Sequence, residues 1–152
     1  MGWYYQYQSK FDFQNQNFSY FQSHSENKNS LSHNSVNAIA EDSDGTLWIA
    51  TNGGLNKFER KIQKFTHYRE KDGLKTDRIY SVIEDKNGMF WLGEAGNSIF
   101  DPKTTTITNY IGLKAGCSGA NQGAYFKASD GEIILGSLGV CAFQPEEVIK
   151  ES

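Results

Sequence analysis

Proline and cysteine are scarce, with two of each in a chain of 152 residues. Two cysteines say little about the compartment, and a disulfide between Cys117 and Cys141 is possible in an oxidising one. Long apolar runs are missing, since none approaches the roughly 18 residues that a membrane-spanning helix needs. The first residues, Met1–Gln6, show neither a basic region nor an apolar core, so no signal peptide is expected there. We therefore expect no direct membrane insertion by this segment.

An excess of positive charge is also missing. The chain carries 15 basic and 18 acidic residues, scattered without blocks, for a net charge of −3. Basic patches are what draw nucleic acids and anionic membranes, so neither is expected as the main partner. What the sequence does contain is aromatic side chains (14%) and 15 glycines. That composition favours many short strands joined by turns.

Three copies of one pattern organise the chain. Glu41–Thr51 returns at Glu84–Gly93 and, in weaker form, at Ala128–Gly136. The shared glycines lie 43 residues apart, at Gly45, Gly88 and Gly131. A fixed period of this length, built on strand-like runs, indicates a repeat architecture.

Each well-formed copy predicts four strands in succession. In the first copy they are Val36–Glu41, Thr46–Thr51, Leu55–Glu59 and Lys64–Tyr68. In the second copy they are Ile79–Glu84, Phe90–Gly93, Asn97–Asp101 and Thr106–Tyr110. Asp44-Gly45 and Asn87-Gly88 are turn signals, because glycine accepts the positive φ of a tight hairpin turn. Each copy should therefore form one twisted antiparallel sheet.

The two ends of the chain hold less complete copies. The third copy predicts strands at Gly123–Lys127, Ile133–Gly136 and Val140–Phe143, and Glu146–Lys150 is either a fourth strand or the exit from the domain. Near the N-terminus, Lys10–Asp12 and Asn17–Phe21 align with the last two strands of the first copy. With them, Trp3 falls near the place of Trp48.

The sequence resembles the two-component regulator propeller repeat. The resemblance rests on Leu31–Thr51 and the flanking Gly53–Phe58, while Glu94–Asn97 departs from the expected Thr-x-x-Gly-Leu pattern. It implies a β-propeller in the sensor region of a bacterial receptor, often tuned to glycans and located in the periplasm. In that family a small β-sandwich, a membrane span and an output domain typically follow.

The expected fold is all-β, a partial β-propeller of four-stranded antiparallel blades forming a single array over 1–152. We assign a blade remnant to 3–22, full blades to 35–69 and 78–110, and a terminal blade to 122–150. Because a blade buries both faces only between neighbours, the open array should seek the remaining blades of a parent propeller or a second copy of the chain.

Candidate ligand-binding residues are the polar groups at equivalent places where each unit begins. They should converge on one mouth of the propeller, suiting a hydroxyl-rich or anionic ligand. Arg78 is the candidate anion clamp. The alternative is that these side chains only cap turns and hydrate the channel. The residues are Asn34, Asn37, Asp77, Arg78, Tyr80, Asn121 and Gln122.

Other polar and aromatic candidates have simpler explanations. Asp42–Gly45 has the oxygen density of a calcium loop but runs straight into a strand, so a turn is favoured. Trp48 and Trp91 could stack on a sugar, but their fixed strand position favours packing between blades. The histidines lack metal-ligand spacing with each other or the cysteines, so no metal or cofactor is expected.

The leading function is therefore non-catalytic recognition of a small molecule or oligosaccharide in a bacterial sensor. One alternative is a propeller enzyme, a lyase or hydrolase acting on glycans, although no convergent acid–base set is visible. Another is a scaffold that binds protein partners.

Overall fold

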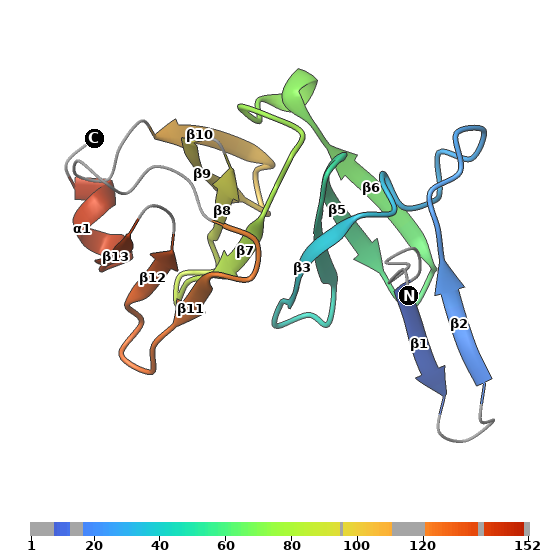
Figure 1. Cartoon of the computed structure of the whole chain (residues 1–152), viewed down its shortest axis with the longest axis horizontal. Helices are drawn as coiled ribbons and strands as arrows, with labels where there is room; N and C mark the ends of the chain where they lie inside the picture. Colours follow the sequence, from blue (N-terminus) through green and yellow to red (C-terminus); the bar gives the residue numbers. More distant parts are fainter. Residues whose placement is uncertain (1–7, 13–16, 95, 111–120, 137–138, 151–152) are drawn as a thin grey trace.

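The computed structural model describes residues 8–12, 17–94, 96–110, 121–136 and 139–150. It is almost entirely β-structure (Figure 1). The first two strands are β1 (Gln8–Asp12) and β2 (Asn17–Phe21), which form a hairpin. The remaining strands are β3 (Val36–Glu41), β4 (Leu47–Thr51), β5 (Gly54–Glu59), β6 (Lys64–Tyr68), β7 (Ser81–Glu84), β8 (Phe90–Glu94), β9 (Gly96–Asp101), β10 (Thr106–Tyr110), β11 (Tyr125–Lys127), β12 (Ile133–Gly136) and β13 (Val140–Phe143).

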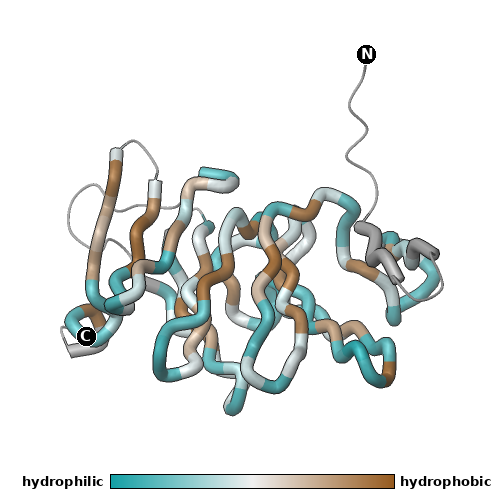
Figure 2. Tube along the Cα trace, turned by 90° about the horizontal axis from the view of Figure 1, so that it is seen from below, coloured by the Kyte–Doolittle hydropathy of each residue, from teal (hydrophilic) through white to brown (hydrophobic). Residues whose placement is uncertain are grey.

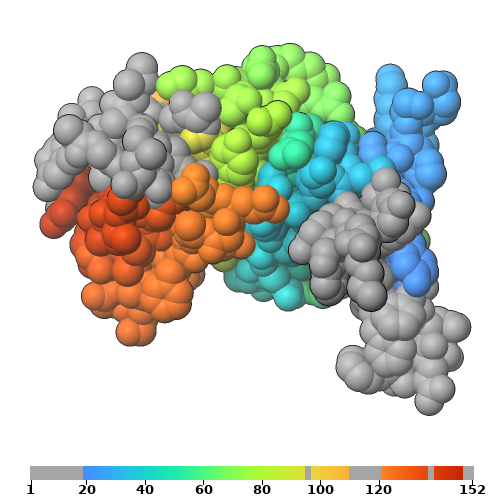
Figure 3. Space-filling view, in the orientation of Figure 1, coloured from blue at the N-terminus to red at the C-terminus, as the bar shows by residue number. Residues whose placement is uncertain are grey.

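The strands form separate antiparallel sheets in which sequence neighbours pair. The two complete sheets have the orders β3-β4-β5-β6 and β7-β8-β9-β10, and β11-β12-β13 forms a three-stranded sheet. The sheets stand side by side in chain order, from the β1–β2 hairpin at one end to β13 at the other (Figures 1 and 3). The first strands of the other three sheets adjoin one another, since both β3 and β11 lie against β7. These sheets are propeller blades, and the array is a partial β-propeller.

The first hairpin of each complete blade is built around one aspartate. Asp42 Oδ1 accepts hydrogen bonds from the backbone N–H groups of Asp44 (3.0 Å) and Thr46 (2.9 Å), and Gly45 adopts a positive φ of 78°. In the second blade Asp85 does the same for Asn87 and Met89, with Gly88 at φ 79°. The acidic oxygens are therefore used inside the turn, as the turn prediction requires.

Apolar residues are concentrated in the strands, which hold most of the brown segments of Figure 2, and their buried side chains form clusters that join neighbouring sheets. Trp48 on β4 is 1% exposed and packs against Phe90 and Phe100 of the next blade, with ring centroids 4.9 and 5.2 Å away. Trp91 on β8 is likewise buried, 5.0 Å from Phe143 of the terminal blade. The prediction that both tryptophans pack between blades is confirmed.

The C-terminal segment corrects one of the two readings left open. Glu146–Lys150 does not add a fourth strand, because Pro145–Lys150 forms the short helix α1. Proline is favoured at a first helical position, and Glu146 and Glu147 place negative charge in the first turn. Val148 of α1 is packed against the core between the second and third sheets. Cys141 is buried and disulfide-bonded, whereas Cys117 lies outside the described residues, as does Trp3.

Candidate functional site

One end of the array, which we call the loop face, carries the connections between blades. It comprises Asn34–Asn37 at the entry to β3, the β4–β5 turn at Asn52–Gly54, and Thr76–Tyr80 before β7. The opposite end carries the aspartate turns. Backbone bonds join the two blades at the loop face, since Ile79 N–H donates to Thr51 O (3.0 Å) and Gly54 N–H to Asp77 O (2.6 Å). The loop face is therefore a continuous surface across two blades.

A cavity of about 270 Å³ opens on the loop face between these blades, lined by Asn52, Thr76, Arg78 and Tyr80. Arg78 is exposed, and its guanidinium offers paired donors to a carboxylate or to vicinal hydroxyls. Tyr80 adds a ring and a phenol, a combination suited to a sugar face and its hydroxyls. We call this the mouth cavity.

Asn37 supports the mouth cavity from the inner strand. Its Nδ2 donates to Asn52 Oδ1 (2.9 Å) and to the carbonyl of Ile79 (2.7 Å), so it ties the two blades together. Because the Asn52 oxygen already accepts this bond, the Asn52 amide nitrogen is left to donate. Asn37 thus acts as a positioning residue for the cavity.

Buried polar side chains fix the loops behind the loop face. In the first blade Asn56 Oδ1 accepts from Ser32 N–H (2.8 Å), and Asn56 Nδ2 contacts Thr51 Oγ1 (3.5 Å). In the second blade Glu94 occupies the place of Thr51, and its Oε2 accepts from Thr76 N–H at 3.1 Å. Ser98 occupies the place of Asn56. The first blade therefore has its shorter side chain of the pair on β4 and the longer on β5, whereas the second blade has the longer on β8 and the shorter on β9.

Glu94 is fully buried, and its Oε1 shares a hydrogen bond with the hydroxyl of Ser98. Burial raises the pKa of the Glu94 carboxyl, although the hydrogen bonds from Ser98 and from the backbone of Thr76 and Lys75 act in the opposite direction. The exchange of Thr51 for Glu94 therefore places a buried carboxyl group directly behind Thr76 of the mouth cavity. Glu94 is also the first residue of the segment in which the second copy departs from the repeat pattern.

The structure brings together only part of the set of residues predicted from sequence. Arg78 and Tyr80 share the mouth cavity, and Asn37 adjoins it through Asn52. Asn34 instead accepts a hydrogen bond from Ser23 N–H (2.7 Å), and Asp77 accepts one from Glu70 N–H (2.7 Å). Both therefore cap loops, as the alternative interpretation held.

Asn121 and Gln122 are exposed just before the terminal blade, and neither lines the mouth cavity. The structure adds two residues that sequence reasoning missed, Asn52 and Thr76. Asn52 was recoverable, because it directly precedes the Gly53-Gly54 turn that opens on the same face as the loops before β3 and β7. Thr76 gave no local signal.

Among the described residues, no group of three or more histidine, cysteine, aspartate or glutamate side chains could hold a metal ion. In that same part of the chain, no helix has both the length and the apolar character needed to cross a membrane.

The two-component regulator propeller family model matches residues 30–53 and 73–95, which are the segments that enter β3 and β7 and continue through the first hairpin of each complete blade. No curated protein matches the chain. Among solved structures, the extracellular domain assigned to a hybrid two-component system from B. thetaiotaomicron superposes with a TM-score of 0.75 at 23% identity. That alignment covers 90% of this chain and 19% of the other, so the chain spans about a fifth of its neighbour's length.

A second group of similar structures is enzymatic. Virginiamycin B lyase from Staphylococcus aureus superposes with a TM-score of 0.60 at 14% identity, over 91% of this chain and 48% of the lyase. The catalytically inactive H270A form of that lyase with quinupristin gives a TM-score of 0.62 at 9% identity, over the same shares. At these identities the likeness shows the fold alone. The chain is a partial β-propeller in which two segments, 30–53 and 73–95, match the two-component regulator propeller model.

Proposed function

We propose that this chain is the ligand-recognising part of the extracytoplasmic region of a bacterial two-component receptor, and that it performs no chemistry itself. The family match at 30–53 and 73–95 and the similarity to a hybrid-system extracellular domain support this assignment. The observation that carries the proposal is the mouth cavity, where Asn52, Thr76, Arg78 and Tyr80 meet from two blades.

The chemistry of the mouth cavity favours a hydroxyl-rich ligand that carries a carboxylate, such as an acidic oligosaccharide. Arg78 supplies a planar pair of donors, while Tyr80 supplies stacking area. Asn52 and Thr76 add short polar groups held in place by Asn37 and Glu94. Because these groups come from both blades, a ligand in the cavity would bridge them.

A thermal-shift screen with neutral and uronic-acid oligosaccharides tests the proposal. A specific ligand raises the melting temperature of the native protein, since it binds the folded state alone. Arg78→Ala and Tyr80→Ala should abolish that rise, whereas Lys103→Ala, an exposed cation at the opposite end, should not. Release of new sugar ends from any polysaccharide would instead favour the lyase or hydrolase alternative.

We also propose that the blade to which β1 and β2 belong is completed by inner strands that pack against β3–β6. Trp48 is surrounded by Tyr68, Phe90 and Phe100 at the boundary between the two complete blades. The equivalent positions one blade earlier are Phe21, Leu47 and Phe58, which line an apolar groove of about 230 Å³. Beside it Ile39 is 47% exposed.

The groove therefore has the same kind of lining as the site that holds Trp48 in the next boundary. We assign it to the inner strands of the blade to which β1 and β2 belong, and an indole on those strands would occupy the place that Trp48 occupies at the next boundary. The much greater length of the B. thetaiotaomicron neighbour is consistent with additional blades.

A further inference from the structure

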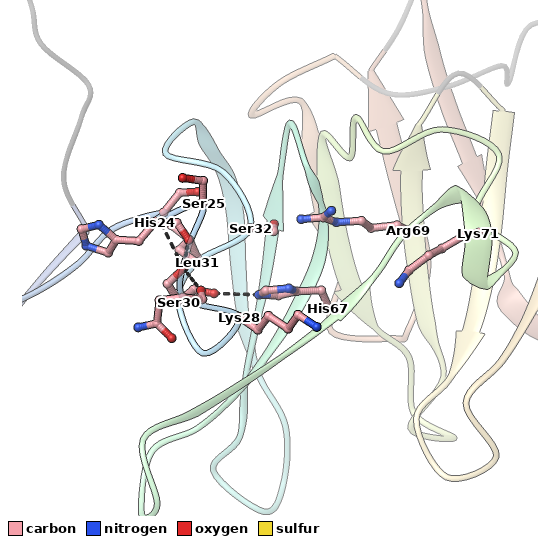
Figure 4. Close-up of a pocket in the computed structure, with 11 residues that line it drawn as sticks. His24, Ser25, Lys28, Ser30, Leu31, Ser32, His67, Arg69 and Lys71 are labelled. Atoms are coloured by element: carbon pink, nitrogen blue, oxygen red, sulfur yellow. Dashed lines mark hydrogen bonds between the residues drawn. The ribbon is translucent and has the colours of Figure 1, made fainter.

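A second cavity, of about 570 Å³, opens on the loop face one blade nearer the N-terminus. Its walls are the connection from β2 to β3, the end of β6 and the short 3-10 helix η1 (Glu70–Asp72) (Figure 4). Lys28, Arg69 and Lys71 line it together with His67, and no carboxylate is present among its described lining residues. In a chain of net charge −3, this is a local concentration of positive charge. We call it the basic pocket.

The cations of the basic pocket form no ion pair with any residue that the structure describes. Among the described residues, the ion pairs involve Lys57, Arg60 and Lys86, and none of the three pocket cations. The Arg69 Nε is buried and donates to no acceptor in that part of the chain. A buried donor without a partner is unfavourable, and like charges in one pocket repel, so an anion would relieve both costs.

The nearest acidic side chains are engaged elsewhere. Asp72 Oδ2 accepts from the Arg69 backbone N–H (2.9 Å), and Glu70 Oε1 accepts from Asp77 N–H (3.3 Å). Figure 4 shows the Arg69 guanidinium and the Lys71 ammonium directed toward the wall that carries Ser30 and Ser32. The acidic side chains of η1 therefore do not line the pocket or neutralise its cations.

The opposite wall is held in place by hydrogen bonds. Ser30 Oγ accepts from His24 N–H (3.0 Å), and the Ser30 carbonyl accepts from His67 Nε2 (2.7 Å). Burial lowers the pKa of His67, and the nearby Arg69 and Lys71 act in the same direction, while the bond to Ser30 opposes them. The imidazole is therefore a neutral donor that fixes the loop.

We propose that the basic pocket binds an oxyanion group (a carboxylate, phosphate or sulfate) of a small solute. Arg69 acts as the hydrogen-bonding clamp, because its planar fork matches two oxygens of such a group. Lys28 and Lys71 contribute charge from two different loops. The basic pocket and the mouth cavity share no lining residue. A test of anion binding in the basic pocket is therefore independent of a test of the proposed function.

Titration of the native chain with inorganic phosphate, sulfate and acetate at constant ionic strength tests this assignment. The Arg69 Nε–H resonance should shift and saturate, and the pKa of His67 should rise because the bound anion offsets the nearby cations. The three anions separate a phosphate or sulfate preference from a carboxylate preference.

Arg69→Gln and Lys71→Gln should each weaken binding about tenfold, which corresponds to about 1.4 kcal/mol. Lys61→Gln and Lys103→Gln remove the same charge from exposed sites outside the pocket and should leave affinity unchanged. Circular dichroism confirms that each variant is folded. Equal weakening by all four variants, or the same response to chloride, would overturn the proposal by reducing it to general charge screening.

Discussion

The indole N–H of Trp91 donates to Oδ2 of Asp85 at 3.0 Å, and both residues are buried. The same bond joins Trp48 to Asp42 at 2.8 Å in the preceding blade. One carboxylate thus holds a turn with one oxygen and positions the interblade indole with the other. The third copy has alanine at 128 and isoleucine at 134, so it has lost donor and acceptor together.

Asp85→Ala should strongly destabilise the protein. The substitution leaves the Trp91 indole and the backbone N–H groups of Asn87 and Met89 without their acceptor. Unpaired buried donors cost about 1–3 kcal/mol, so we expect the free energy of unfolding to fall by about 3 kcal/mol. Urea denaturation measures the change. Asp44→Ala, at an exposed turn position, should change it by less than about 0.5 kcal/mol, and equal effects would contradict this account.

Ser98 stands between two acceptors with one proton to give. Asn109 Nδ2 donates to the Gly73 carbonyl (2.9 Å), so Asn109 Oδ1 is the atom that faces the Ser98 hydroxyl at 2.6 Å. When Ser98 donates its proton to Asn109, the contact between Ser98 and Glu94 Oε1 is a hydrogen bond only if the Glu94 carboxyl is protonated and donates. The raised pKa of Glu94 agrees with this arrangement, because it favours the protonated carboxyl group.

Glu94→Gln should therefore stabilise the protein at alkaline pH. The pKa of Glu94 in the folded protein lies above the ordinary value of 4.5. The contribution of Glu94 to the free energy of unfolding is therefore fully present below pH 4.5, and it is lost as the pH rises through the pKa of the folded state. Glutamine supplies the missing hydrogen at every pH, which should gain about 1 kcal/mol at pH 8 and little at pH 4.

Denaturation curves at both pH values check this prediction, with the exposed Glu26→Gln as the control that should show no difference. A Glu94→Gln protein that is less stable than the native chain at pH 8 would mean that the carboxylate is ionised in the fold.

Leu47→Lys should prevent a preceding blade from packing on the apolar groove. Leu47 and Ile49 line the groove, and a charge placed there would be buried by any strand that docks. Light scattering and melting curves over a range of concentrations would compare the isolated chain with a longer chain that includes the preceding repeat. If the longer chain shows equal stability with and without the substitution, the groove is not a blade boundary, whereas a concentration-dependent native dimer would identify a second copy as the occupant.

Local patterns predicted the strands well where turn and alternation signals agree. Lys64–Tyr68 and Thr106–Tyr110 are present with the predicted ends, because alternating residues follow a clear reversal of the chain. Ile79 was predicted to lie in a strand that begins only at Ser81, since its N–H donates across the blade boundary to Thr51 instead. That bond depends on how two blades stack, which a local pattern does not encode.

The candidate site was predictable only in part for the same reason. Arg78 and Tyr80 could be placed at the mouth because they are polar residues at the position where a repeat unit begins. The conformations of loops bring Thr76 into the mouth cavity and place Lys28 beside Arg69 in the basic pocket. Those conformations are set by buried groups such as Glu94 and Ser30, whose partners lie far away in sequence.

The recognition role of the loop face is tested most directly by mapping amide resonances of the chain during titration with a uronic-acid oligosaccharide. We predict saturable shifts at Asn52, Thr76 and Tyr80 and at the Arg78 side chain, with none in the turns at 42–45 and 85–88, and loss of these shifts in Arg78→Ala. Shifts confined to those turns, or none with any acidic or neutral oligosaccharide, would contradict the proposal.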